Sequence, residues 1–405
     1  MKRLLVVSRL FPNNSEPLKG IFVKEQLLQL RKHFGIQVIS PVPWSIPWGS
    51  KRWRLTAAIH SRHVIDGIEV SYPRYFMIPK VGRFLDGFFY CLSLLVLMKK
   101  FIGRYACDAV VVHWAYPDAF GVILMNYILK KPIFIQVHGS DINTGTRSYL
   151  TRRMIVFALK RANKVFSVAY QLREKMVALG IEEDRICVVP NGVNPGVFSP
   201  RDRNAVRAQL GLPLQKKIVL FVGNLVDVKG LPYLIEAAAF LLEARKDLLF
   251  LIIGEGRRKE ALHHMILQHH LQEDVRLIGS KPHADIPYWM SSCDLFCLPS
   301  LSEGCPTVLI EALASGRPVL GTEVGDIPRL LGMSGGGYTV RPGDSKALAG
   351  GIAKTLTQVW DPDVLSRSVR ELTWDSSARK ICTRVSAELQ AEARGGSDYS
   401  DCVEH

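Results

Sequence analysis

The chain has 405 residues, of which 48% are hydrophobic and 22% charged, a composition typical of folded globular proteins that excludes a mainly disordered chain. This length accommodates two domains of roughly 150 to 200 residues. The net charge is +15 at pH 7, and residues 1–200 carry all of the excess, with 28 Lys and Arg against 12 Asp and Glu; residues 201–405 hold 24 against 25. A basic half joined to a neutral half predicts two domains with different partners, one of them anionic: a nucleic acid, a phospholipid or a phosphorylated substrate.

The cysteines and the apolar segments bear on the compartment. The eight cysteines form no C-x-x-C pair and no Cys/His set with zinc spacing, which indicates free thiols in a reducing cytoplasm. The apolar run at residues 4–7 is too short for the core of a signal peptide and predicts a buried strand instead. The most hydrophobic later stretch, residues 84–98, contains Asp86 and Gly87 and is shorter than the about 20 residues of a membrane span. We therefore expect a cytoplasmic protein without a transmembrane segment.

Short β-rich apolar runs alternate with longer helix-period stretches along the whole chain. In the first half the expected strands are residues 4–7, 36–39, 109–112, 133–137, 164–168 and 186–189, and the expected helices are 21–32, 84–101, 119–129, 152–160 and 170–179. In the second half the expected strands are 217–222, 248–253, 275–278, 294–298 and 318–320, and the expected helices are 232–242, 259–268 and 307–314. Such alternation predicts parallel βαβ units. The fold class is therefore α/β, with two Rossmann-like doubly wound domains in tandem.

A turn-rich segment marks the boundary between the two domains. Residues 190–196 are dense in Pro, Asn and Gly, and residues 198–214 are polar and bounded by proline, so we place the linker there. The predicted domains are residues 1–195 and 196–375, followed by a helix at 376–393 and a polar tail at 394–405 that we expect to be frayed. Ligands of such sheets bind at the carboxyl ends of the strands, so we expect the site in strand-end loops that face a cleft between the domains.

The most informative segment is residues 299–318, PSLSEGCPTVLIEALASGRP. A loop with Glu303 and Gly304 follows the expected strand, and Pro306 stands where a helix would begin. Free backbone amides and the positive helix end then point into the loop, which is the arrangement of a phosphate site. Glu311 falls about one turn into the helix, and a carboxylate that accepts two hydrogen bonds suits the vicinal hydroxyls of a ribose or hexose. The alternative is a capped surface helix with two incidental glutamates.

With these motifs the sequence strongly resembles the family 4 retaining glycosyltransferases, two-domain enzymes of the GT-B type, from its first strand to about residue 388. The resemblance implies that the first domain binds the acceptor and the second a nucleotide sugar. It implies that Glu303 contacts the transferred sugar and that Glu311 binds the nucleotide ribose. The backbone between them is implied to meet the sugar or the diphosphate: Gly304, Cys305, Pro306 and Thr307. The helix at 376–393 is implied to return to the first domain.

A second segment, residues 221–231 (FVGNLVDVKGL), reads as strand, loop and helix start. Lys229 at the helix start is suited to neutralise a diphosphate, and the alternative is a solvated lysine. In the family that the chain resembles, an Arg usually follows the position of Gly223, and that Arg and the Lys both touch the leaving phosphates. This chain has Asn224 instead. Either Asn224 donates a neutral hydrogen bond, or another basic residue takes the place of the Arg.

In the first half, His138 follows an expected strand within the string HGSD. The resemblance implies that His138 faces the donor sugar, whereas a lone histidine after a strand is more often structural. Asp141 is a further candidate on the acceptor side. Gly20 lies in the loop after the first strand, where the family often has a Gly-Gly pair that admits acceptor and diphosphate. His113 and Trp114, after another strand, would line the acceptor side; the alternative is packing of an aromatic loop.

No metal site or further cofactor is expected. Asp361-Pro362-Asp363 forms a D-x-D, which binds a divalent metal in other glycosyltransferases. Here it precedes a C-terminal helix away from any strand end, and aspartates in such positions commonly cap helices. The Gly254-Glu255-Gly256 string lacks the third glycine of a dinucleotide fingerprint. We assign it to the nucleotide-side loops.

Clustered tryptophans in the basic half suggest a membrane surface. Trp44, Trp48 and Trp53 are interleaved with basic residues, namely Lys51, Arg52 and Arg54. Tryptophan favours the membrane–water interface, and each basic residue contributes about 1 kcal/mol near an anionic leaflet. The hypothesis is that the first domain docks on the inner face of the cytoplasmic membrane to reach a lipid-linked acceptor. The alternative for residues 84–98 is a buried crossover helix.

The function predicted from these features is metal-independent transfer of a sugar from a nucleotide diphosphate to a hydroxyl, and the resemblance implies that the configuration of the sugar is retained. The expected acceptor is a lipid-linked glycan in the biosynthesis of cell-envelope or extracellular polysaccharide. Two alternatives share the architecture: a nucleotide-sugar epimerase, and a non-catalytic nucleotide-sugar-binding protein. A nucleic-acid binder would also explain the charge, but no recognition motif supports it.

Overall fold

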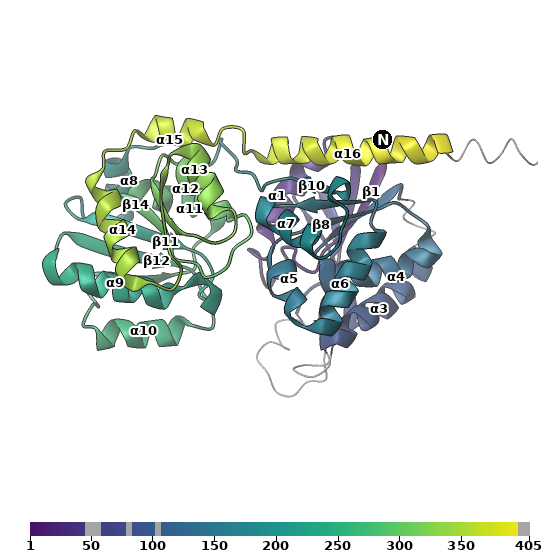
Figure 1. The fold of residues 1–405 in the computed structure, drawn as a ribbon, viewed down its shortest axis with the longest axis horizontal. Coiled ribbons are helices and arrows are strands. Elements are labelled where there is room, and N and C mark those ends of the chain that lie inside the picture. Colours follow the sequence, from purple (N-terminus) through teal and green to yellow (C-terminus); the bar gives the residue numbers. More distant parts are fainter. Residues whose placement is uncertain (45–57, 78–82, 102–106, 396–405) are drawn as a thin grey trace, which may run out of the picture. The chain divides into compact units, whose positions relative to one another are not determined.

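The computed structural model describes residues 1–44, 58–77, 83–101 and 107–395. The chain divides into two compact units (Figure 1). Unit 1 comprises Met1–Pro190 and the chain from Trp374 onward, and unit 2 comprises Asn191–Thr373. The chain thus enters unit 2 a few residues before the boundary predicted at 195. Of the predicted tail, residues 396–405 lie outside the described part.

Unit 1 is built on one mixed sheet. Its strand order is β10 (Ile186–Val188), β9 (Lys164–Ser167), β8 (Ile133–Val137), β7 (Ala109–His113), β1 (Arg3–Val7), β2 (Gly35–Ile39), β5 (Ile68–Ser71) and β4 (Arg62–Ile65). All of the pairings are parallel except the one between β4 and β5. A separate parallel pair joins β3 (Val42–Trp44) to β6 (Arg74–Phe76). The six strands predicted for this half are confirmed.

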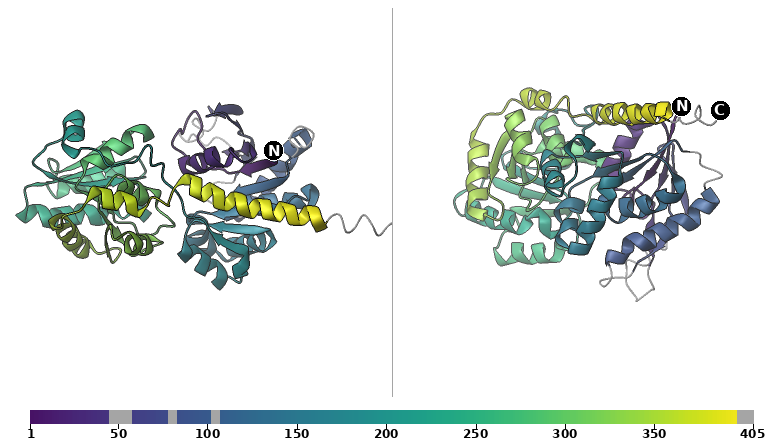
Figure 2. Two further views of the ribbon diagram at one scale, coloured as in Figure 1. Left: turned by 90° about the horizontal axis from the view of Figure 1, so that it is seen from above. Right: turned by 45° about the vertical axis from the view of Figure 1, so that its right-hand side comes forward.

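Helices cover this sheet, and the last of them comes from the far end of the chain. The helices are α1 (Ile21–Leu30), α3 (Asp86–Phe101), α4 (Phe120–Leu129), α5 (Ser140–Asn143), α6 (Tyr149–Arg161), α7 (Tyr170–Ala178) and α16 (Trp374–Gly395). Figure 2 shows α16 lying along unit 1. Its apolar stripe joins the core that α1 and β1 form: Ala378, Ile381, Val385 and Leu389. Each buried Ile, Val or Leu contributes roughly 1.5–3 kcal/mol, so α16 is an integral part of unit 1.

Unit 2 has an all-parallel sheet. Its strand order is β13 (Val275–Gly279), β12 (Leu248–Ile253), β11 (Lys217–Val222), β14 (Leu295–Leu298), β15 (Val319–Thr322) and β16 (Gly337–Val340). Its helices are α8 (Arg203–Leu210), α9 (Leu231–Ala244), α10 (Lys259–Gln268), α11 (Ile286–Ser292), α12 (Thr307–Ala314), α13 (Ile327–Ser334), α14 (Ser345–Thr357) and α15 (Pro362–Ser368). Every residue of β12 and β14 is buried, as parallel strands covered on both faces require. The predicted class, two doubly wound α/β domains, is confirmed.

The linker predicted at residues 198–214 is wrong, because this polar segment contains α8. The Asp202 side chain caps the helix by accepting a hydrogen bond from the Ala205 N–H at 2.7 Å. The buried Arg207 guanidinium donates to the Ser292 carbonyl at 2.8 Å and to the Asp294 carboxylate at 2.6 Å. The sequence alone does not distinguish a buried arginine that is hydrogen-bonded to the protein from one that is solvated. This is why the segment resembles a linker.

Two further expectations concern cysteines and membrane spans. No helix in the described part of the chain is long and apolar enough to cross a bilayer. The described cysteines are free thiols: Cys91, Cys107, Cys187, Cys293, Cys297, Cys305 and Cys382.

Candidate functional site

Three loops meet at the carboxyl edge of the unit 2 sheet. They follow β12, β11 and β14, which are neighbours in the sheet, so their carboxyl ends lie side by side. The Leu225 N–H donates to the Glu255 carbonyl at 2.9 Å, which ties the loop after β11 to the loop after β12. The Leu301 N–H donates to the Val228 carbonyl at 2.8 Å, which ties it to the loop after β14. The middle loop, residues 223–230, is therefore held on both sides.

Lys229 and Glu303, both predicted from the sequence, form an ion pair at this edge. Lys229 Nζ lies 2.6 Å from Glu303 Oε1, and the Ser300 hydroxyl donates to the same oxygen at 2.6 Å. The two side chains are only 20% and 10% exposed, and short charge-assisted hydrogen bonds in such surroundings are strong. Gly230 makes the close approach of the loops feasible, because its φ is +63° and a Cβ there would lie 2.0 Å from the Pro299 carbonyl oxygen. The pair thus fixes a carboxylate and an ammonium group at one point.

The loop after β14 leads into the N-terminus of α12, as predicted. The first amides of α12 have no partner within the helix, and the helix dipole makes this end positive. The loop is anchored through its carbonyls: the Asp326 N–H donates to Gly304 O at 3.0 Å, and the Asn191 side chain donates to Cys305 O at 3.0 Å. Burial raises the pKa of the Cys305 thiol to about 12, so this side chain is a neutral packing group. Asn191, which the sequence reasoning missed, lies in the turn-rich segment that it had assigned to the linker.

Glu311 lies one turn into α12 and is 7% exposed. Its Oε1 is 3.8 Å from His283 Nε2, in the loop after β13. The His283 ring packs edge-on against Phe198, with a centroid distance of 5.8 Å. The sequence reasoning missed His283, although its place after a strand was a usable signal. This carboxylate is therefore held beside an imidazole and an aromatic ring, at the same edge as Glu303.

Asn224 is exposed in the middle loop, at the position where the resemblance leads one to expect an arginine. The neighbouring loop after β12 carries Arg257 and Arg258, and both pair with the Asp227 carboxylate. Arg258 Nε lies 3.1 Å from Asp227 Oδ1. Asp227 begins the 3₁₀ turn that ends at Lys229. The structure therefore places two guanidinium groups of the neighbouring loop against a carboxylate of the loop that contains Asn224.

In unit 1, His113 at the end of β7 and His138 after β8 lie in contact, as neighbouring strands allow. His113 Nδ1 and His138 Nε2 are 2.9 Å apart, and Trp114 stacks on His138 with a centroid distance of 4.4 Å. Burial lowers the pKa of His113 to about 3. Burial and then the neighbouring His113 hold the pKa of His138 well below its usual range. Both imidazoles are therefore neutral at pH 7, and one donates to the other.

The Asp141 carboxylate organises the two loops that carry these histidines. It accepts hydrogen bonds from the N–H groups of Gly139 at 2.9 Å, Ala115 at 3.1 Å and His138 at 3.2 Å. Burial raises its pKa, and these amides act in the opposite direction. In the structure its contacts are those of a positioning residue, and contact with an acceptor stays a prediction.

Gly20, the remaining predicted residue of the acceptor side, is the N-cap of α1. Its φ is +65°, and a Cβ there would lie 2.1 Å from the Leu10 carbonyl oxygen. Only glycine fits this turn, because it packs directly on the chain that leaves β1.

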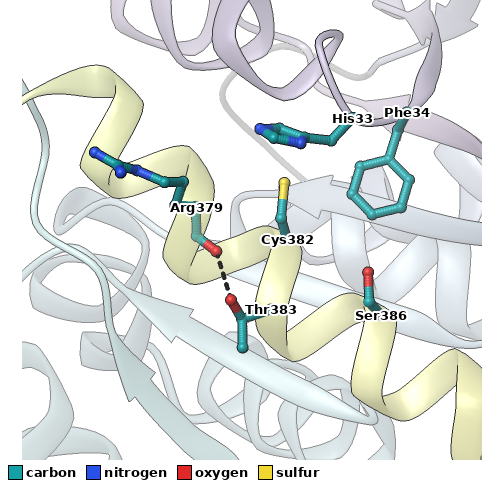
Figure 3. Close-up of a pocket in the computed structure, with 6 residues that line it drawn as sticks. All are labelled: His33, Phe34, Arg379, Cys382, Thr383 and Ser386. Carbon is teal, nitrogen blue, oxygen red and sulfur yellow. Dashed lines mark hydrogen bonds between the residues drawn. The ribbon is translucent and has the colours of Figure 1, made fainter.

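A hollow on the other side of unit 1 does not belong to this site. Figure 3 shows that His33 and Phe34, the two residues that precede β2, face four residues of α16: Arg379, Cys382, Thr383 and Ser386. The Thr383 hydroxyl donates to the Arg379 carbonyl of its own helix at 3.0 Å. The hollow lies at the amino ends of the strands, whereas His113 and His138 lie at the carboxyl ends.

The D-x-D string caps a helix, as expected from its sequence context. Asp361 accepts hydrogen bonds from the N–H groups of Asp363 at 2.8 Å and Val364 at 3.3 Å, at the start of α15. In the described residues, no group of three or more His, Cys, Asp or Glu side chains is placed to hold a metal ion.

Comparisons with known proteins match the chain to glycosyltransferases. A family profile described as Glycosyl transferases group 1 matches residues 202–370, and one described as Glycosyltransferase Family 4 matches residues 61–197. The Bacillus subtilis protein named "Putative teichuronic acid biosynthesis glycosyltransferase TuaC" is 28% identical over 372 residues, which cover 89% of this chain and 91% of the relative. The amylovoran biosynthesis glycosyltransferase AmsK of Erwinia amylovora is 29% identical over 252 residues, 60% of each chain.

Solved structures share the fold. Sucrose-phosphate synthase from Thermosynechococcus elongatus superimposes with a TM-score of 0.75 at 18% identity, over 97% of this chain and 100% of that chain. HepE from Anabaena, in complex with UDP-glucose, superimposes with a TM-score of 0.66 at 19% identity, over 98% and 100%.

Proposed function

We propose that this chain, which belongs to glycosyltransferase family 4, transfers a sugar from a UDP-sugar to a hydroxyl of a lipid-linked glycan, with retention of configuration at the transferred carbon. The observation that carries the donor side is the ion pair of Lys229 and Glu303 beside the N-terminus of α12. Amides, a helix end and an ammonium group suit a diphosphate. Glu303 and Glu311 are proposed to bind the hydroxyls of the sugar and of the ribose.

The chemistry proposed for the site is positioning and charge stabilisation rather than covalent catalysis. The leaving phosphate takes the proton of the attacking hydroxyl, and no protein nucleophile or metal is required. Lys229 and the α12 amides stabilise the negative charge that develops on the diphosphate. His138, kept neutral by its surroundings, serves as a hydrogen-bonding group for substrate rather than as a cation.

A thermal-shift series tests the donor. UDP-, GDP- and ADP-sugars are screened for a rise in Tm, since a ligand that binds the native state stabilises it. UDP-sugars are expected to give the largest rise, and Glu311→Ala should diminish it. An unchanged Tm with all three classes of nucleotide sugar would refute the proposal. Incubation of the best donor alone then distinguishes the alternatives, because an epimerase converts it to an isomer without an acceptor.

The acceptor is proposed to be a glycan on a lipid carrier, in biosynthesis of envelope or extracellular polysaccharide. The names of TuaC and AmsK, which refer to teichuronic acid and amylovoran biosynthesis, support this assignment. An acceptor in a membrane requires the enzyme to reach the bilayer. The cytoplasmic membrane face is the proposed location, because activated nucleotide sugars and free thiols belong to that compartment.

An exposed apolar stripe on unit 1 is proposed to contact an anionic bilayer. Phe84, in the 3₁₀ turn that precedes α3, and Phe88 and Leu92, in the first half of α3, recur every four residues and are exposed. The neighbouring α4 ends with exposed Tyr127 and Ile128, and is followed by two exposed lysines, Lys130 and Lys131. The positive excess of residues 1–200 is complementary to anionic lipid. Of the predicted tryptophan cluster, Trp44 is exposed, while Trp48 and Trp53 and their basic neighbours lie outside the described residues.

Vesicle co-sedimentation tests this surface. The protein is expected to pellet with phosphatidylglycerol vesicles more than with phosphatidylcholine vesicles, and Phe88→Ser combined with Leu92→Ser should lower the bound fraction several-fold. Val359→Ser is the matched control, because Val359 is an exposed apolar residue of unit 2. Equal recovery with neutral and anionic vesicles would contradict the proposal.

A further inference from the structure

The ion pairs of the three loops at the carboxyl edge of unit 2 are unevenly balanced. Lys229 is matched by Glu303, and Lys259 Nζ is matched by Glu255 Oε1 at 2.8 Å. Arg257 and Arg258, by contrast, share the single carboxylate of Asp227. Among the described ion pairs of these loops, two guanidinium charges therefore face one carboxylate. The positive charge that remains unbalanced belongs to this arginine pair and not to Lys229.

Backbone contacts fix the arginine pair against the loop of Asn224. The Leu225 N–H donates to Glu255 O, and the Arg258 N–H donates back to Leu225 O at 3.0 Å. Two glycines allow this contact. A Cβ on Gly254 would lie 1.9 Å from Gly223 O, and one on Gly256 would lie 2.3 Å from Leu225 O. The two arginines therefore lie next to the point where the two loops cross, close to the uncharged Asn224.

We infer that Arg257 and Arg258 are diphosphate-binding residues of the donor site, and that Asp227 holds them beside it when no donor is bound. This inference rests on the proposed function. The diphosphate of a bound nucleotide carries at least two negative charges. Lys229 alone does not neutralise them, because its ammonium group already pairs with Glu303. The planar guanidinium group offers two parallel N–H donors to phosphate oxygens. Arg257 and Arg258 are 72% and 40% exposed, so either can turn from Asp227 to a ligand without unpacking the core.

Titration calorimetry with UDP, GDP and ADP, and with uridine, guanosine and adenosine, separates phosphate binding from base binding. For the diphosphate that binds the wild type best, Arg257→Gln combined with Arg258→Gln is expected to raise Kd about 10- to 100-fold, and to leave the Kd of the matching nucleoside unchanged. Asn224→Arg added to this double variant should recover most of the loss, because it returns a cation to the same loop.

Arg245→Gln is the matched control. Arg245 Nη2 pairs with Asp247 Oδ2 at 2.7 Å before β12, at the amino edge of the same sheet, so its loss should leave every Kd unchanged. An unchanged Kd for the diphosphate in the double variant would overturn the inference while leaving the proposed function intact. Failure of the wild type to bind any of the three diphosphates would instead overturn the proposed function, and this inference with it.

Discussion

Replacement of His113 by glutamine tests the neutrality of the buried histidine pair. His113 is fully buried, and within the part of the chain that the structure describes its Nε2 has no hydrogen-bond partner. Nothing there compensates an imidazolium charge, which is why burial lowers the pKa of His113 to about 3. Glutamine keeps a hydrogen-bonding group next to His138 and does not titrate.

The pKa of His113 fixes the direction and size of the effect. The folded-state pKa lies below the unfolded-state value of about 6.5, so the stabilising contribution is complete above about pH 6.5 and is lost progressively as the pH falls toward 3. At pH 5 an unfolded histidine is almost fully protonated while His113 in the fold is not. The difference removes about 2 kcal/mol from the unfolding free energy of unit 1, relative to pH 7.5. His138 contributes with the same sign.

Hydrogen exchange in a urea series at pH 7.5 and pH 5 measures this difference. Peptides from β7 and β8 report the opening of unit 1 alone, which matters because a chain with two units need not unfold in one step. In His113→Gln the loss of stability between the two pH values should be about 2 kcal/mol smaller than in the wild type. His263→Gln, on the exposed face of α10, should behave as the wild type does. An equal pH dependence in His113→Gln and the wild type would refute the reasoning.

Three other substitutions address catalysis, donor affinity and the docking of the last helix. Glu303→Gln should lower kcat about 10²- to 10³-fold because it removes a carboxylate fixed by Lys229 and Ser300, and a donor-turnover assay with near-normal kcat would contradict this. Glu311→Ala should raise the donor Kd about 10-fold or more with a smaller change in kcat, measured by calorimetry and single-turnover kinetics. Ile381→Ala should destabilise unit 1 by about 2–5 kcal/mol, because Ile381 is fully buried in its core; unchanged urea midpoints for β1 peptides would show that α16 does not support the sheet.

The sequence was informative where local pattern and strand-end position carry the signal. Buried parallel strands are continuous apolar runs, so residues 217–222 and 248–253 were predicted with the observed bounds. Glu303 and Lys229 were both identified because each stands in a segment that connects such a strand to a helix start and that resembles a family motif. Their direct contact could not be predicted, since it depends on β11 and β14 being neighbours although β12 and β13 lie between them in the chain.

What the sequence did not predict depends on partners distant in the chain. Arg207 resembles a solvated residue until Asp294 and distant carbonyls surround it. His283 becomes a candidate site residue only because it lies beside Glu311. The pairing of Arg257 with Asp227 depends on the crossing of two loops at Gly254. The antiparallel strand β4 was missed because its exposed residues lack the apolar run of a central strand. For the three side chains the missing information was a contact, and for β4 it was an apolar pattern.

The last helix of the chain has a consequence for the order of folding during synthesis. Unit 1 needs α16 for its core, but the ribosome makes all of residues 191–373 before it reaches Trp374. At about 5–20 residues per second, this interval lasts roughly 10 to 40 s. Unit 2 can complete its fold within that time, while the face of unit 1 that receives Ile381, Val385 and Leu389 stays uncovered. The first part of the protein to be synthesised is therefore the last to be finished, and chaperones have that interval in which to recognise it.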